Sequence, residues 1–180
     1  MPSDQECDQR RNEKMIIAVD VHYKASAAKA VSIEFPDWED EVPWKINIVK
    51  IEGYTDYIPG EFYKRELPCI MCVLEKSDLK QAEAIIIDGY VILDDQGKPG
   101  LGGYLFQELN KKIPVIGVAK TCFTGNKRHV VKVYRGNSGN PLFITSLGME
   151  LREAADLVRR MKGNFRIPLL LRKLDRETKI

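Results

Sequence analysis

A buried β-strand is indicated by the run Ile16-Ile17-Ala18-Val19-Asp20-Val21-His22-Tyr23, which is apolar and rich in β-branched residues. One acid, Asp20, interrupts this run, and a buried carboxylate without a partner is energetically costly. The partner is either a lysine or arginine in an ordinary ion pair, or a metal ion at the mouth of an active site. Further acids at comparable places in the chain would favour the metal ion.

A second apolar run also ends in an acid. Ala84-Ile85-Ile86-Ile87-Asp88-Gly89 is continuously apolar, which is typical of a central parallel strand covered on both faces. Asp88 falls at the carboxyl end of this strand, where the sites of α/β sheets gather, and Gly89 allows a turn or a close ligand. With Glu66, the two strand acids predict a carboxylate cluster that suits Mg²⁺. Without a cation the crowded carboxylates would raise one another's pKa values.

The remaining pattern predicts an α/β protein. Segments 26–35 and 44–51 follow the first strand after short links, which indicates an antiparallel meander. Segment 114–120 is a third core strand and ends in Lys120, which either contacts a phosphate near the acids or is a surface lysine. Segments 130–134 and 141–146 read as short strands, the first of them in a surface hairpin arm. Helices are expected at 68–74, 104–111 and 148–162, and the tail 165–180 is expected to pack across the sheet.

Length and composition limit the possible classes. The chain has 180 residues, so we expect a polar appendage at 1–14 and a single domain at 15–180. Hydrophobic residues make up 44% and charged residues 30%, as in globular proteins in solution, and the net charge of +2 permits nucleic-acid binding without indicating it. No apolar run is long enough for a membrane span and no signal peptide is visible, so we expect a cytoplasmic protein.

Cys69 and Cys72 form a C-x-x-C pair in the segment expected to be a helix. A zinc site would need a second pair of ligands at suitable spacing, and the sequence has none. A redox motif would need exposed thiols at a helix start. We favour the third possibility, small apolar residues on a buried helix in a reducing compartment.

Two loops carry alternative interpretations. Tyr57, Ile58 and Pro59 lie beside a turn at Pro59-Gly60, so they either pack against the body or form a stiff wedge that enters between bases. The glycine-rich loop 94–103 matches no known phosphate-binding spacing, although it would suit an enzyme of a phosphorylated metabolite.

Taken in order, these segments resemble the endonuclease V family, repair nucleases that act on deoxyinosine. The resemblance runs from about residue 15 to residue 175 and is carried by Ala18-Val19-Asp20-Val21-His22-Tyr23, Tyr57-Ile58-Pro59-Gly60, Arg65-Glu66-Leu67-Pro68, Ile87-Asp88-Gly89, Ile116-Gly117-Val118-Ala119-Lys120, Pro141-Leu142-Phe143-Ile144-Thr145-Ser146 and Arg166-Ile167-Pro168.

The resemblance implies a ribonuclease H-like fold, with a mixed five-stranded sheet whose first three strands are antiparallel, flanked by helices. It also implies a monomer that hydrolyses a phosphodiester 3′ of inosine in DNA or RNA, using Mg²⁺ or in its place Mn²⁺. Asp20, Glu66 and Asp88 would be the catalytic residues and the metal ligands. The substrate-binding residues would be Tyr57, Ile58, Pro59 and Gly60 of the wedge, together with Gly89 and Lys120.

The sequence departs from the family pattern at three places. Met149 stands where the family usually has a histidine, Asp94 and Lys98 lie where it has a His-Pro-Arg run, and Asp56 replaces a proline. If the missing histidine acted beside the acids, cleavage would be slow and Met149→His would speed it, unless His22, Asp94 or Lys98 supplies the function. The alternative is a degenerate module that binds deaminated nucleic acid with little or no cleavage.

Overall fold

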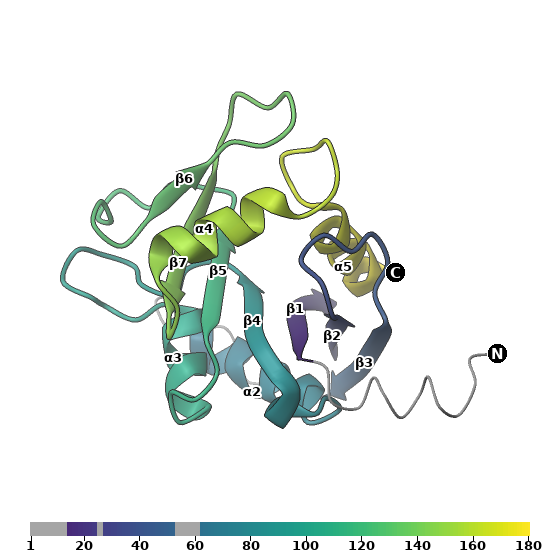
Figure 1. Ribbon diagram of the computed structural model, residues 1–180. Coiled ribbons are helices and arrows are strands. Elements are labelled where there is room, and N and C mark those ends of the chain that lie inside the picture. The colour runs from purple at the N-terminus through teal and green to yellow at the C-terminus, as the bar shows by residue number, and fades with distance from the viewer. Residues whose placement is uncertain (1–13, 25–26, 53–61) are drawn as a thin grey trace.

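The computed structural model describes residues 14–24, 27–52 and 62–180, which form a mixed sheet with helices on both faces (Figure 1). The strands are β1 (Met15–Lys24), β2 (Ala27–Phe35), β3 (Lys45–Glu52), β4 (Ala82–Asp88), β5 (Val115–Ala119), β6 (Val131–Val133) and β7 (Leu142–Leu147). Their order across the sheet is β3-β2-β1-β4-β5-β7-β6. The α/β class and the antiparallel arrangement of β1, β2 and β3 are confirmed.

The prediction of five strands is wrong, because the described residues form a sheet of seven. β7 pairs antiparallel with β5, and β6 pairs antiparallel with β7, so both extend the sheet beyond the central strands. Segment 130–134, expected in a separate surface arm, therefore supplies the edge strand of the sheet. Val133 is fully buried, which explains why this short segment stays attached.

The two faces of the sheet are covered by different helices. The helices are α2 (Phe62–Leu74), the 3₁₀ turn η2 (Leu79–Gln81), α3 (Leu101–Glu108), α4 (Leu151–Arg160) and α5 (Leu169–Lys179). α2 and α3 pack on the face that carries Ile17 and Val19, and α4 and α5 pack on the face that carries Ile16 and Ala18. Because side chains alternate along a strand, Asp20 shares the face of Ile16 and Ala18, under α5.

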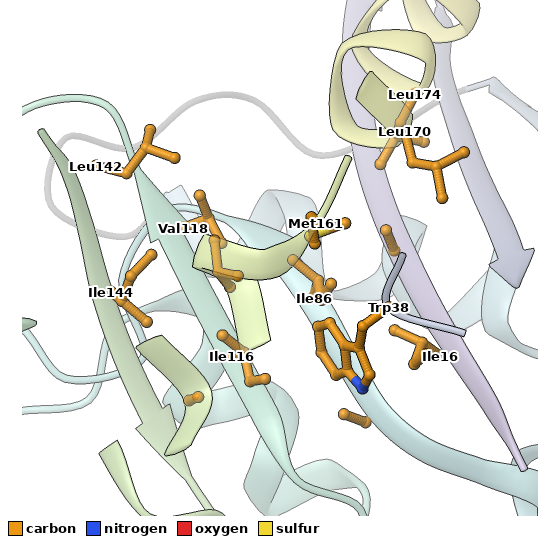
Figure 2. Close-up of a cluster of buried hydrophobic side chains, with 14 of the residues drawn as sticks. Ile16, Trp38, Ile86, Ile116, Val118, Leu142, Ile144, Met161, Leu170 and Leu174 are labelled. Atoms are coloured by element: carbon orange, nitrogen blue, oxygen red, sulfur yellow. The ribbon is translucent and has the colours of Figure 1, made fainter. Parts of the chain in front are cut away.

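The face under α4 and α5 is a continuous apolar layer (Figure 2). Ile86 and Val118 from neighbouring strands meet Met161, which follows α4, and Leu170 and Leu174 of α5. The segment expected to pack across the sheet is therefore a helix, and Leu170, Leu174 and Thr178 are its buried residues at intervals of four. This spacing fixes which side of α5 faces the strands.

Two helices differ in detail from the prediction. α2 begins at Phe62, earlier than expected, and contains Pro68 on its exposed side. Cys69 is buried and Cys72 is exposed, both as free thiols, so the expectation of two buried cysteines is right only for Cys69. No helix in the three described ranges is both long enough and apolar enough to cross a membrane.

The glycine-rich loop has a structural explanation. A Cβ atom on Gly102 would lie 2.7 Å from Val91 Cγ2, and one on Gly103 would lie 2.6 Å from the Val91 carbonyl oxygen. These glycines allow α3 to pack directly on the segment that follows β4. Packing therefore explains both glycines, which removes the main reason to expect a phosphate-binding site in this loop.

Candidate active site

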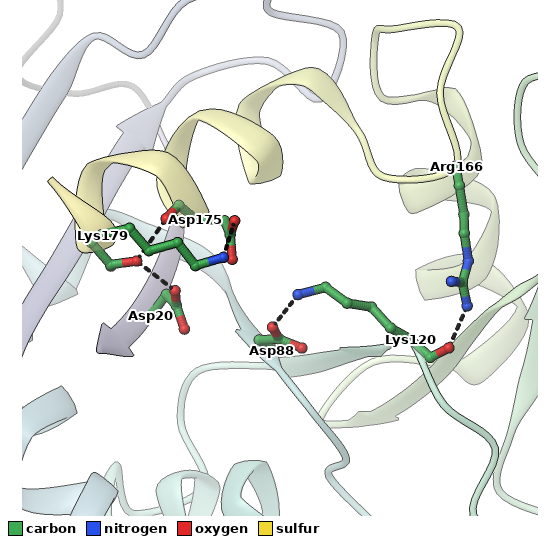
Figure 3. A network of polar contacts seen from close by, with 7 residues as sticks. Asp20, Asp88, Lys120, Arg166, Asp175 and Lys179 are labelled. Atoms are coloured by element: carbon green, nitrogen blue, oxygen red, sulfur yellow. Dashed lines mark hydrogen bonds and ion pairs between the residues drawn. The ribbon is translucent and has the colours of Figure 1, made fainter. Parts of the chain in front are cut away.

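Asp20, Asp88 and Lys120 meet at one edge of the sheet because three parallel strands end there side by side. β1, β4 and β5 are adjacent and parallel, with Val19 opposite Ile87 and Asp88 opposite Val118. Lys120 directly follows β5, so its side chain emerges beside Asp88. Figure 3 shows the three side chains at this edge, beneath α5. The predicted gathering of strand acids at the carboxyl edge is therefore present.

Asp88 and Lys120 form an ion pair. Lys120 Nζ donates to Asp88 Oδ2 at 2.6 Å, and the two side chains are 37% and 43% exposed, respectively. Burial alone would lower the pKa of Lys120, but the hydrogen bond and charge of Asp88, with smaller effects from Asp175 and Asp20, raise it overall. The ammonium group therefore stays charged inside an acidic site.

Asp20 is partly buried and has a hydroxyl partner on α5. The hydroxyl of Thr178 donates to Asp20 Oδ2 at 3.0 Å, although the two residues are 158 positions apart in the sequence. Burial raises the pKa of Asp20, and the charges of Asp88 and Asp175 act in the same direction, while the Thr178 hydrogen bond partly opposes them. Asp20 is thus oriented by α5.

Glu66 approaches the strand acids from α2. Its side chain is 9% exposed, and its carboxyl pKa is raised to about 8, first by burial and then by the charges of Asp20 and Asp88. Arg65 acts in the opposite direction but does not cancel these effects. The three acids predicted from the sequence are therefore close enough for their charges to affect one another.

A fourth acid, Asp175, was not predicted. Asp175 lies on α5, lines the same cavity as Asp20 and Asp88, and raises the pKa of both Asp20 and Lys120. Its Oδ2 accepts an ion-pair hydrogen bond from Lys179 at 2.7 Å (Figure 3). The spacing of Leu170 and Leu174 in the tail indicates a helix, but it does not show that Asp175 and Thr178 face the strand acids.

Gly89 and Tyr90 fix the backbone next to Asp88. Gly89 has φ of +126°, which favours glycine, and its N–H donates to the Val118 carbonyl at 3.2 Å. The Tyr90 hydroxyl donates to the Thr121 carbonyl at 2.8 Å and accepts from the Phe123 N–H at 3.0 Å. The turn after Asp88 and the loop after Lys120 are thereby held together.

The donor atoms of this site suit a hard divalent cation. Asp20, Glu66, Asp88 and Asp175 offer carboxylate oxygens, and their mutual repulsion would be relieved by positive charge. Within the described ranges, however, no three His, Cys, Asp or Glu side chains converge closely enough to enclose a metal ion as they stand. Lys120 donates to Asp88 Oδ2, so a cation bound through that oxygen would compete with the ammonium group.

The expectation that Met149 stands close to the acids is wrong. β7 runs antiparallel to β5, so Phe143 lies opposite Ala119, whereas Leu147 lies opposite Val115 at the other end of that strand. Met149 follows Leu147 and is therefore at the sheet edge opposite Lys120, where it packs against the apolar layer under α4. The position of Met149 can be recognised only from the direction in which β7 runs through the sheet.

We therefore expect Met149→His to leave the nicking rate unchanged, because a proton donor at the far edge of the sheet cannot reach the reacting atoms. Single-turnover nicking of an inosine-containing strand by both proteins checks this. A faster Met149→His variant would contradict the placement of β7.

Of the other uncertain residues, Asp94 and Lys98 belong to a local turn, whereas His22 lies on the strand that carries Asp20. Asp94 Oδ1 accepts the N–H groups of Gln96 at 3.0 Å and Lys98 at 2.9 Å, so Asp94 organises its own turn and Lys98 belongs to that turn. The assignment of Asp94 to the site is thus not supported. His22 lies two residues beyond Asp20 on the same strand, opposite Lys29. Tyr57, Ile58, Pro59 and Gly60 lie outside the described residues.

The fold and the site define an α/β protein with a group of interacting acids at the carboxyl edge of its parallel strands. Sequence comparison gives its family. The Endonuclease V family model matches residues 3–176, so the chain belongs to the Endonuclease V family. It is 31% identical over 115 residues to Endonuclease V of Sulfurisphaera tokodaii, covering 64% of this chain and 54% of that protein. It is 28% identical over 126 residues to Endonuclease V of Saccharolobus solfataricus, covering 68% and 60%. The chain thus spans between about half and three fifths of these relatives.

Solved structures share the fold. Endonuclease V from Streptomyces avermitilis has a TM-score of 0.71 at 19% identity, covering 99% of this chain and 92% of that one. An Endonuclease V variant from Ciona intestinalis, in complex with a 23mer DNA containing an inosine, has a TM-score of 0.75 at 14% identity, covering 99% and 97%. Human Endonuclease V has a TM-score of 0.68 at 20% identity, covering 93% and 83%. At these identities the likeness establishes the fold.

Proposed function

We propose that this protein is a divalent-metal-dependent endonuclease that cleaves a phosphodiester 3′ of inosine in DNA or RNA, as part of nucleic-acid repair. The observation that carries the proposal is the group of interacting acids Asp20, Glu66 and Asp88, at the carboxyl edge of the sheet in a chain of the Endonuclease V family. The Ciona relative crystallised with inosine-containing DNA supports the choice of substrate. We further propose a ribonuclease H-like fold and a single domain spanning 15–180.

Each residue of the site has a role in this proposal. Asp20, Glu66 and Asp88, with Asp175 beside them, would hold Mg²⁺ or Mn²⁺, which when bound polarises the phosphate and activates water. Lys120 would leave its ion pair with Asp88 and contact a phosphate oxygen instead. Its positive charge would balance the negative charge that develops on that phosphate. Thr178 would keep the Asp20 carboxylate oriented through its hydrogen bond. The wedge role proposed for Tyr57, Ile58 and Pro59 is to fill the space left by a displaced base.

A nicking assay tests the proposal. We would compare single-stranded and duplex DNA and RNA that differ only by inosine or adenosine at one position, with Mg²⁺, Mn²⁺ or EDTA. We expect cleavage only with a metal ion and only 3′ of inosine. Equal cleavage of the adenosine controls, or full activity in EDTA, would contradict the proposal.

A second candidate function, a binding module with little cleavage, is favoured by two observations. Lys120 Nζ donates to Asp88 Oδ2 at 2.6 Å. Within the described ranges, no three side chains that could ligate a metal come close enough together to hold one. If the ion pair persists on the substrate, the protein would bind inosine-containing strands selectively and leave them intact. If the protein binds inosine-containing strands selectively but does not nick them with either metal ion, the binding module becomes the better-supported function.

A further inference from the structure

A cavity of about 760 Å³ adjoins the acids on the side of α5. Asp20, Asp88 and Lys120 line one end of it, so it opens where the proposed reaction takes place. The rest of its wall is mainly apolar and comes from the sheet, from α5 and from the segment between α4 and α5. The apolar lining residues include the buried Ile86, Val118, Leu142 and Leu174 and the partly exposed Ile167 and Leu171.

The rim of the cavity carries an aromatic ring that is held in place. Phe165 is 51% exposed, and the Arg172 guanidinium lies 4.0 Å from the centre of its ring. The backbone beneath the ring is fixed, because Arg135 Nη1 donates to the Phe165 carbonyl at 3.0 Å and Arg166 Nη2 donates to the Pro141 carbonyl at 2.8 Å. Phe165 is therefore positioned before any ligand arrives.

Among the residues that the structure describes, four basic and four acidic side chains line the cavity, and three of the four basic ones lie on α5. Lys120, Arg172, Lys173 and Arg176 all line it, whereas the acids are concentrated at the reaction end, with Glu41 on the loop between β2 and β3. A nucleic-acid strand complements the aromatic ring and the basic side chains, with flat bases that stack on aromatic rings and phosphates that attract lysine and arginine.

We propose that this cavity binds one unpaired nucleobase of the strand being cut, at a nucleotide adjoining the scissile phosphate, with the base stacked on Phe165. The inference rests on the proposed function. A base that enters this half-open cavity and stacks on Phe165 is turned away from its pairing partner, so the strand next to the lesion must be single or locally open. The site thus selects inosine in unpaired strands over inosine in an intact duplex.

An abasic scan tests the inference. Single strands with one inosine, each lacking one base on either side of it, are bound in EDTA to the wild-type protein and to Phe165→Ala, with affinity measured by fluorescence anisotropy. At one position next to the cut, loss of the base should weaken wild-type binding roughly tenfold. Phe165→Ala should weaken binding of the complete strand to a similar extent, and the two losses should not add.

Two variants serve as controls. Phe165→Tyr keeps the ring and should bind like the wild type. Tyr134→Ala removes a ring from a residue that is 57% exposed and does not line the cavity, and it should show no coupling to the missing base. Thermal unfolding of Phe165→Ala should match that of the wild type, because Phe165 is half exposed.

Two other outcomes would contradict the inference. Losses that add at every position would overturn the subsite, and coupling to the inosine base itself would overturn the assignment to its neighbour. Nicking of the complete strand in Mg²⁺ separates the two proposals. Normal nicking without coupling removes only the subsite, whereas absence of both nicking and inosine-selective binding removes the proposed function and the subsite with it.

Discussion

Replacing Asp88 by asparagine should slow nicking of an inosine-containing strand by at least about 10³-fold while the protein remains folded, since charge stabilisation by a bound metal ion is worth several kcal/mol. The variant removes an anionic oxygen from the group that would hold the cation and releases Lys120 from its ion pair. The Asp88 side chain is 43% exposed at a strand end, so no core packing is lost. Binding of inosine-containing strands should persist, because the phosphate contacts that dominate affinity remain.

Single-turnover nicking in Mg²⁺ measures this effect, with thermal unfolding and binding measured on the same samples. Asp156→Asn is a matched control, because Asp156 is an exposed acid on α4 whose ion-pair partner is Arg159. This control should cut like the wild type. Normal nicking by a folded Asp88→Asn protein would refute the assignment of the acidic centre.

In EDTA, the free energy of unfolding should decrease by a few kcal/mol, in order of magnitude, as the pH rises from about 4.5 to about 8. The cause is Glu66, whose pKa is raised from its usual 4.5 to about 8 in the folded protein by burial and by Asp20 and Asp88, against the opposing charge of Arg65. The folded state therefore binds this proton more tightly than the unfolded state. Its stabilising contribution is complete below pH 4.5 and is lost as the pH rises through 8.

A divalent cation should reverse this loss, because ligation requires the deprotonated carboxylates and cancels their repulsion. Mg²⁺ or Mn²⁺ should thus raise the melting temperature more at pH 8 than at pH 5, without any need for substrate. Glu66→Gln should flatten the pH dependence and reduce the cation effect, whereas Glu108→Gln, a change at an exposed acid on α3, should do neither. A melting temperature at pH 8 that does not respond to either cation would contradict the metal site.

Local sequence pattern predicted the strands and most of the acidic centre for a definite physical reason. Asp20 and Asp88 each interrupt or end an apolar run, and such acids collect at one edge when the strands are parallel neighbours. Asp175 and Thr178 could not be predicted in the same way, because their roles depend on α5 lying over β1. Met149 was misplaced because sequence does not state the direction in which β7 runs through the sheet.

The hydrogen bond between Thr178 and Asp20 also has a consequence for biosynthesis. It joins β1 to α5 across 158 positions, so the two parts of the carboxylate centre are translated at different times. β1, β4 and β5 can pair during translation, but Asp175 and Thr178 join them only after α5 has left the ribosome. A nascent chain would therefore carry an incomplete centre until α5 has been translated and has packed over β1.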